Sequence, residues 1–129
     1  MNTGEFITLQ RQIDHLILEK KYLEAYKQIQ DLLNQQEINL TGEQIHYLLN
    51  LQSNTKYAAE SQILLQIIKD MYPHSTSGLR ISRDEIHQRA IAQRGFFTWT
   101  RADLERAIDY LILHDLLPAH IEGNDIVFD

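Results

Sequence analysis

Arginine is unevenly distributed along this chain of 129 residues. Six of the seven arginines lie between residues 80 and 106, where four Asp and Glu side chains leave a net charge of +2. A guanidinium group is planar and always charged, so it can hold two acceptor atoms of a phosphate or of a base edge at once. This clustering favours contact with an anionic partner such as nucleic acid. The six residues are Arg80, Arg83, Arg89, Arg94, Arg101 and Arg106.

The rest of the chain is acidic. Its net charge is -6, and residues 107 to 129 contain five carboxylates and no Lys or Arg. An acidic surface repels phosphates, so the composition argues against a protein that coats nucleic acid or an anionic membrane. The alternative is that the arginines pair with neighbouring carboxylates on a solvated face. Those carboxylates are Asp84, Glu85, Asp103 and Glu105.

Other site chemistry is poorly represented in the sequence. The six histidines show no spacing typical of metal ligands, and Asp84, Glu85 and His87 form a common surface pattern, so we expect no metal site. There is no cysteine, no Gly-rich phosphate loop and no nucleophile elbow. The sequence therefore predicts a protein that is not an enzyme and that needs no cofactor.

The sequence predicts a cytoplasmic protein without a membrane partner. No apolar run approaches the roughly 20 residues that a membrane-spanning helix needs, and residues 1 to 15 lack the basic start and apolar middle of a signal peptide. The absence of cysteine fits a reducing compartment.

A helix over residues 98 to 117 positions the last two arginines. Thr100 and Asp103 are spaced for a capping box, and Trp99 and Leu104 for a hydrophobic staple. The apolar stripe that follows at helical spacing is Leu104, Ala107, Ile108 and Leu111. We expect this stripe to face the core and the arginines to face solvent.

The same start signature occurs at Thr41 and at Ser82, with Gln44 and Glu85 as the box partners. The first start predicts a helix to about residue 51, broken by the polar run at residues 53 to 55. A second helix follows over about residues 57 to 72, and a short strand is predicted at residues 79 to 81. The second start predicts a helix to about Gln93, stopped by Gly95.

Residues 5 to 35 are predicted to form two antiparallel helices joined around Lys20 and Lys21. The run KKYLEAYKQIQDLL resembles the second half of a tetratricopeptide repeat, in which a small residue, here Ala25, lets the helices approach closely. We expect an N-terminal helical extension, residues 1 to 56, and a second part, residues 57 to 129, to form one compact unit without a flexible linker.

The chain ends in a predicted β-hairpin centred on Gly123 and Asn124. In a two-residue loop, Ile121 lies opposite Ile126, and Glu122 lies opposite Asp125. Like charges in directly opposite positions are unfavourable.

The order helix, strand, helix, helix, hairpin and the phrase DLERAIDYLILHDLL resemble the winged helix-turn-helix superfamily. Glu105-Arg106 takes the position of a usual Ser-Arg pair, and Asp115-Leu116-Leu117 that of Gly-Leu-Ile. The resemblance implies a mainly α fold in which an N-terminal helical hairpin packs on a winged helix-turn-helix with a C-terminal β-hairpin.

The resemblance also implies a small regulator that binds duplex DNA through its second turn-motif helix. On that helix the base-reading candidates are Thr98, Thr100, Arg101, Ala102, Glu105, Arg106 and Tyr110. The phosphate-contacting candidates are Arg80, Arg83, Arg89 and Arg94. The acidic hairpin departs from the family pattern, because Glu122 and Asp125 repel phosphates. The alternative is an acidic module that binds another protein or inhibits a nucleic-acid-processing complex.

Ile112 and Leu113 extend apolarity beyond the core stripe of the 98 to 117 helix. We interpret them first as the place where the N-terminal helices pack, and second as a subunit interface, for example in a homodimer.

Overall fold

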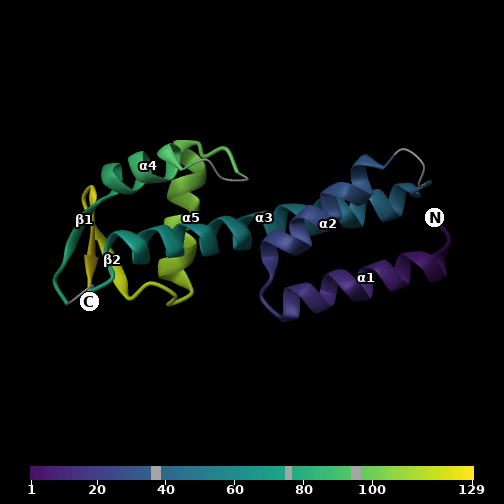
Figure 1. The fold of residues 1–129 in the computed structure, drawn as a ribbon, viewed down its shortest axis with the longest axis horizontal. Helices are drawn as coiled ribbons and strands as arrows, with labels where there is room; N and C mark the ends of the chain where they lie inside the picture. Colours follow the sequence, from purple (N-terminus) through teal and green to yellow (C-terminus); the bar gives the residue numbers. More distant parts are fainter. Residues whose placement is uncertain (36–38, 75–76, 94–96) are drawn as a thin grey trace. The chain divides into compact units, whose positions relative to one another are not determined.

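The computed structural model describes residues 1 to 35, 39 to 74, 77 to 93 and 97 to 129. The chain divides into two compact units, an N-terminal unit, Met1–Ala59, and a C-terminal unit, Glu60–Asp129. It is mainly helical with a small antiparallel sheet (Figure 1), as predicted at that level of detail. The expectation that both parts form one cooperative unit stays a prediction.

The N-terminal unit contains α1 (Thr3–Leu18), α2 (Tyr22–Asn34) and the first part of α3 (Gly42–Met71). The first two helices are antiparallel neighbours that meet at Lys20 and Lys21, which confirms the prediction for this segment. Ala25 is completely buried between them, where a larger side chain would hold the helices apart. The buried core of this unit is formed by Phe6, Ile13, Ala25, Ile29, Leu32 and Leu48.

The predicted break at residues 53 to 55 is wrong, because α3 is continuous from Gly42 to Met71. Ser, Asn and Thr cost a helix only about 0.7 kcal/mol each or less relative to Ala, and the run contains no Gly or Pro. The Thr55 hydroxyl donates to the carbonyl of Leu51 one turn earlier, so its polar group is satisfied within the helix.

The C-terminal unit contains the end of α3, followed by β1 (Arg80–Ser82), α4 (Arg83–Ala92), α5 (Arg101–Leu113), β2 (Ala119–Glu122) and β3 (Asp125–Phe128). The strand order is β1-β3-β2, and both pairs are antiparallel. Strand β1 begins one residue later than predicted. The predicted helix stop at Gly95 lies outside the described residues. The completely buried side chains of the core include Leu64, Ile86, Ala90, Leu104, Ile108, Leu111 and Ile126.

Two of the three predicted capping boxes form. The Thr100 oxygen accepts from the Asp103 amide at 3.1 Å, and Asp103 accepts from the Thr100 amide at 3.2 Å. Thr41 and Gln44 make the same reciprocal pair. At the third site the box prediction is wrong, because the Ser82 hydroxyl accepts from the Asp84 amide and the Glu85 carboxylate accepts from the Tyr72 hydroxyl at 2.6 Å.

Helix α5 ends four residues earlier than predicted, at Leu113. Asp115 adopts a φ of 55°, the left-handed conformation that usually falls to Gly after a helix. The Leu116 amide then donates to the Leu111 carbonyl at 2.9 Å, which closes the helix. The hairpin that follows has the predicted register, with Ile121 opposite Ile126 and Glu122 opposite Asp125.

Candidate functional site

Helix α5 is fixed in the C-terminal unit by its apolar stripe. Leu104, Ile108 and Leu111 are completely buried, and Trp99, which precedes the helix, packs against the same core. The opposite face carries the predicted site residues. Arg101, Ala102 and Arg106 are exposed on it, and Glu105 and Tyr110 are half-buried.

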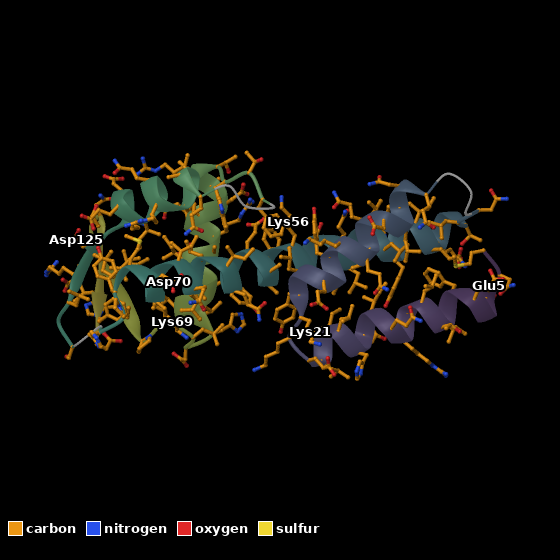
Figure 2. All side chains as sticks on the ribbon, in the orientation of Figure 1. Glu5, Lys21, Lys56, Lys69, Asp70 and Asp125 are labelled. Atoms are coloured by element: carbon orange, nitrogen blue, oxygen red, sulfur yellow. The ribbon has the colours of Figure 1, made fainter. Side chains whose placement is uncertain are left out.

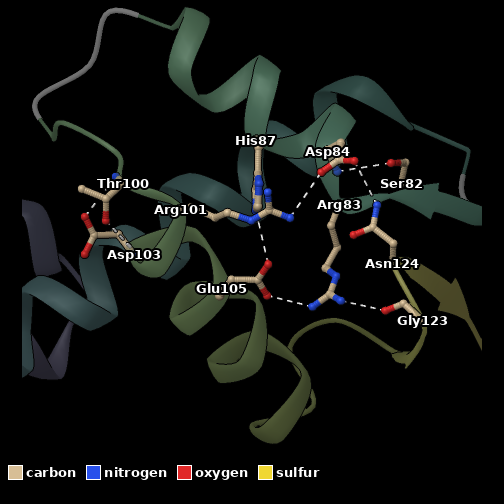
Figure 3. Close-up of polar contacts among 10 residues, drawn as sticks. All are labelled: Ser82, Arg83, Asp84, His87, Thr100, Arg101, Asp103, Glu105, Gly123 and Asn124. Carbon is tan, nitrogen blue, oxygen red and sulfur yellow. Dashed lines mark hydrogen bonds and ion pairs between the residues drawn. The ribbon is translucent and has the colours of Figure 1, made fainter.

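Both arginines of α5 are next to carboxylates of the same unit. Arg101 lies 3.5 Å from an Asp84 oxygen at the start of α4 (Figure 3), and the two side chains are largely exposed. Arg106 binds the Asp103 carboxylate one turn earlier in α5. Asp103 thereby serves both the helix cap and this ion pair. Neither arginine presents an uncompensated charge to solvent.

Arg83 joins three elements of the unit (Figure 3). From the start of α4, its guanidinium donates to Glu105 of α5 at 2.8 Å and to the Gly123 carbonyl in the hairpin turn at 2.7 Å. Its backbone amide also donates to the Asn124 carbonyl at 3.0 Å. The Arg83 side chain is only 20% exposed. This predicted phosphate contact therefore has a structural role in holding the hairpin against α4 and α5.

His87 completes this cluster from α4. Its side chain is 8% exposed, and its Nε2 lies 3.7 Å from a Glu105 oxygen without a hydrogen-bond partner among the described residues. The sequence suggested His87 only as a metal ligand, and Glu105 either as a base-reading residue or as a partner of an arginine, which it is for Arg83. Their spacing of 18 residues gives no local signal, because tertiary packing alone brings them together.

Arg80 makes a second set of contacts with the hairpin. It lies next to β3 and binds both Glu122 and Asp125, the carboxylates that face each other across the turn. The unfavourable pair predicted from the register is thereby bridged by a cation. Hydrogen bonds to Asp129 and then Glu122 raise the pKa of His120. The hydrogen bond from His120 and the positive charge of Arg80 lower the pKa of the Glu122 carboxyl.

The remaining DNA-binding candidates lie on α4, before α5 and further along α5. Arg89 is exposed on α4 in an open groove of about 470 Å³, beside Tyr72 and Glu85. The hydrogen bond to Glu85 raises the pKa of Tyr72. Thr98 and Thr100 are exposed, and the Thr100 hydroxyl is occupied by the cap. The Tyr110 ring lies 4.3 Å from that of His114. Arg94 lies outside the described residues.

The C-terminal end of α5 carries an apolar surface. Ile112 is half-buried against the core of its own unit, whereas Leu113 is 78% exposed. An open groove of about 520 Å³ lies beside Leu113. We call it the α5 groove, and its lining residues are Arg106, Asp109, Tyr110, Ile112 and Leu113. Whether the N-terminal helices dock at Ile112 and Leu113 stays a prediction.

Comparison with protein-family models, with curated proteins and with solved structures gives no match. In the described part of the chain, none of the helices has the length and apolarity of a membrane span. Across the same residues, no group of three or more His, Asp or Glu side chains is arranged to hold a metal ion.

Proposed function

We propose that the C-terminal unit is an acidic interaction module that binds a protein partner rather than duplex DNA. We further propose that it is built as a winged helix-turn-helix. The element order from the end of α3 to β3 and the strand order β1-β3-β2 support that architecture.

The internal use of arginine carries the functional proposal. Among the described arginines between residues 80 and 106, all but Arg89 form ion pairs with carboxylates of the same unit. Affinity for duplex DNA comes largely from Lys and Arg side chains that neutralise phosphates. A phosphate near α5 would lie beside Asp84, Asp103 and Glu105. Residues 60 to 129 carry eleven Asp and Glu against seven Lys and Arg, so the long-range field is also repulsive.

Duplex DNA is the second candidate because three of these arginines, Arg80, Arg101 and Arg106, keep more than half of their side-chain surface in solvent. The side chains of Arg101 and Arg106 keep 69% and 53% of their surface in solvent. An exposed ion pair contributes only about 0 to 1 kcal/mol, so a phosphate displaces a carboxylate at small cost. In that case Arg101→Ala and Arg106→Ala each weaken binding, by about 1–3 kcal/mol for a base-reading arginine.

Fluorescence anisotropy with a mixed-sequence duplex at about 50 mM salt decides between the two, because phosphate contacts are strongest at low salt. We expect no saturable binding by the wild-type protein. The double variant Asp84→Asn, Glu122→Gln removes the carboxylate beside Arg101 and one of the two carboxylates that bind Arg80. We expect it to gain salt-sensitive binding.

The matched control is Asp14→Asn, Asp31→Asn, which makes the same change in net charge at exposed positions of the N-terminal unit. It should leave the anisotropy unchanged. Saturable wild-type binding that is lost in Arg101→Ala and Arg106→Ala would overturn the proposed function in favour of DNA binding.

A further inference from the structure

Strand β2 forms an open edge of the sheet. The strand order is β1-β3-β2, so among the described strands β3 has a neighbour on both sides and β2 has only β3. The Phe128 amide at the end of β3 donates to the Leu79 carbonyl before β1 at 2.9 Å. The next amide, that of Asp129, donates to the Pro118 carbonyl before β2 at 3.0 Å. Even-numbered residues of β3 therefore bond towards β1 and odd-numbered residues towards β2.

The same alternation shows which backbone groups of β2 are left over by the sheet. Glu122 and His120 lie opposite odd-numbered residues of β3, so their N–H and C=O groups point to β3. The N–H and C=O of Ile121 point the other way, together with the C=O of Ala119 and the N–H of Gly123. In the described part of the chain, nothing bonds to these outward groups.

The outward groups are symmetric about Ile121. At one end of the edge, the Ala119 N–H is already used, because it donates to the Leu117 carbonyl at 2.9 Å. At the other end, the Gly123 carbonyl accepts from Arg83 at 2.7 Å. Acceptor, donor, acceptor and donor remain in chain order. A second β2 strand, placed antiparallel about a two-fold axis at Ile121, supplies a partner for each of them.

An apolar row of side chains also ends at this edge. Ile81 of β1, Ile126 of β3 and Ile121 of β2 lie directly opposite one another, so their side chains share one face of the sheet. Ile81 and Ile126 are 1% and 0% exposed, whereas Ile121 is 39% exposed. In the two-fold arrangement, Ile121 of each copy meets Ile121 of the other. The row then continues across both sheets, and its exposed end is buried.

The charged side chains lie on the other face and favour the same register. Arg80 and His120 share one cross-strand row. Asp125, at the start of β3 (Figure 2), and Glu122 share the next row. With the axis at Ile121, His120 of each copy lies opposite Glu122 of the other, whereas an axis at Glu122 would place two like charges opposite each other. These groups are already paired within one molecule, so they select the register and the backbone groups select the partner.

We propose that β2 pairs antiparallel with β2 of a second copy of this chain, about a two-fold axis at Ile121, and joins the two sheets into one. The proposal rests on the proposed function, because it names a protein partner of the same unit. The same strand is used by both copies, so the assembly closes as a dimer. Because β2 has only four residues, the contact is small and the dimer is weak and reversible.

Sedimentation velocity on the full chain tests this proposal. We expect a monomer at low concentration and a dimer, with no larger species, at high concentration. Ile121→Pro removes an outward N–H, and proline is tolerated on an edge strand where the N–H faces solvent. Because each dimer loses two hydrogen bonds, we expect dimerisation to weaken by at least about tenfold.

Ile121→Lys gives a second variant that keeps the N–H. It should weaken the dimer as well, because two like charges then face each other across the axis. Thermal unfolding checks that both variants are folded. Ile91→Lys is the matched control, since Ile91 is exposed on α4 and lies outside β2. It should dimerise like the wild type.

Cross-linking tests the register, because the chain contains no cysteine. In Ile121→Cys, the two introduced thiols lie opposite each other with Cα atoms about 5.5 Å apart, which a disulfide can span. Mild oxidation should give a covalent dimer. Ile91→Cys controls for random collision, because Ile91 is the more exposed position at 63%. It should stay largely monomeric.

A wild-type chain that stays monomeric at every concentration overturns the proposal. A dimer that both Ile121 variants leave unchanged overturns it as well, and so does equal cross-linking of the two cysteine variants, because each places the contact away from β2. None of these results affects the proposed function, which only duplex binding contradicts.

Discussion

At the scale of single residues, one carboxylate organises much of the C-terminal unit. Glu105 receives the Arg83 guanidinium at 2.8 Å and lies 3.7 Å from the buried His87 nitrogen. Through Arg83 it is connected to the hairpin turn at Gly123. The sequence placed Glu105 on the outer face of its helix correctly, but its role depends on partners 18 and 22 residues away. Among these contacts, only the ion pair between Arg106 and Asp103 could be predicted from the sequence alone, because the two residues lie three positions apart in one helix.

We expect Glu105→Gln to lower the free energy of unfolding by about 1–3 kcal/mol, because it leaves a largely buried guanidinium without its counter-charge. Asp84→Asn removes the partner of an exposed arginine and should change it by less than about 0.5 kcal/mol. Urea unfolding of the two variants measures both changes in the free energy of unfolding. Equal effects would show that the Arg83 pair is no more important than a surface contact.

At the scale of elements, the helix starts were predictable and the breaks were not. Capping residues act through bonds within four residues, so Thr41 and Thr100 identify their helices from sequence. The polar run in α3 is helical because weak propensities are overridden by packing on both sides of it. Leu48 before the run and Leu64 after it are completely buried.

The β2-β3 hairpin carries the clearest pH dependence among these elements. The pKa of His120 is raised by its bond to Asp129 and then by Glu122, so protonation stabilises the folded hairpin. That stabilisation is fully present below the unfolded value of about 6.5 and is lost as the pH rises through the folded pKa. Glu122, whose pKa is lowered, stabilises above its unfolded value and loses this contribution as the pH falls through the folded pKa.

Histidine resonances followed by NMR from pH 5 to 9 should show His120 titrating above 6.5 in the wild type. Asp129→Asn should move its titration towards that value, because it removes the largest cause of the shift. An unchanged His120 titration in Asp129→Asn would contradict the assigned contact.

At the scale of the whole molecule, α3 is the feature that the sequence did not predict. One helix supplies residues 42 to 59 to the N-terminal unit and residues 60 to 71 to the C-terminal unit. A break in this region would have interrupted the helical backbone between the two units. The continuous helix instead makes the folding of one unit favour the helical state needed by the other.

We expect both units to unfold in one transition. Trp99, the only tryptophan, reports on the C-terminal unit, and far-ultraviolet circular dichroism reports on the helices of both. Asn54→Pro removes a helix hydrogen bond and should cost about 3 kcal/mol or more. In this variant, the Trp99 signal and the circular dichroism signal should show different unfolding midpoints.

Gly42→Pro is the control, because Gly42 is the first residue of α3, where proline is tolerated. An added Cβ at this position meets nothing within 4 Å. If the Trp99 and circular dichroism signals of the wild type already show different unfolding midpoints, the two units fold independently.

The contacts that hold the hairpin turn have a consequence for how this chain can diverge. Arg83 donates hydrogen bonds to the backbone carbonyls of Gly123 and Asn124. Every amino acid has such a carbonyl. These two bonds therefore do not depend on which side chains occupy the turn, provided that residue 123 tolerates its φ of 61°. The Asn124 side chain adds a third bond, to Asp84 at 3.0 Å. Sequence drift at the turn can remove that bond while the two bonds to Arg83 are kept. For the same reason, the turn is a suitable site for grafting a short epitope or a spectroscopic label.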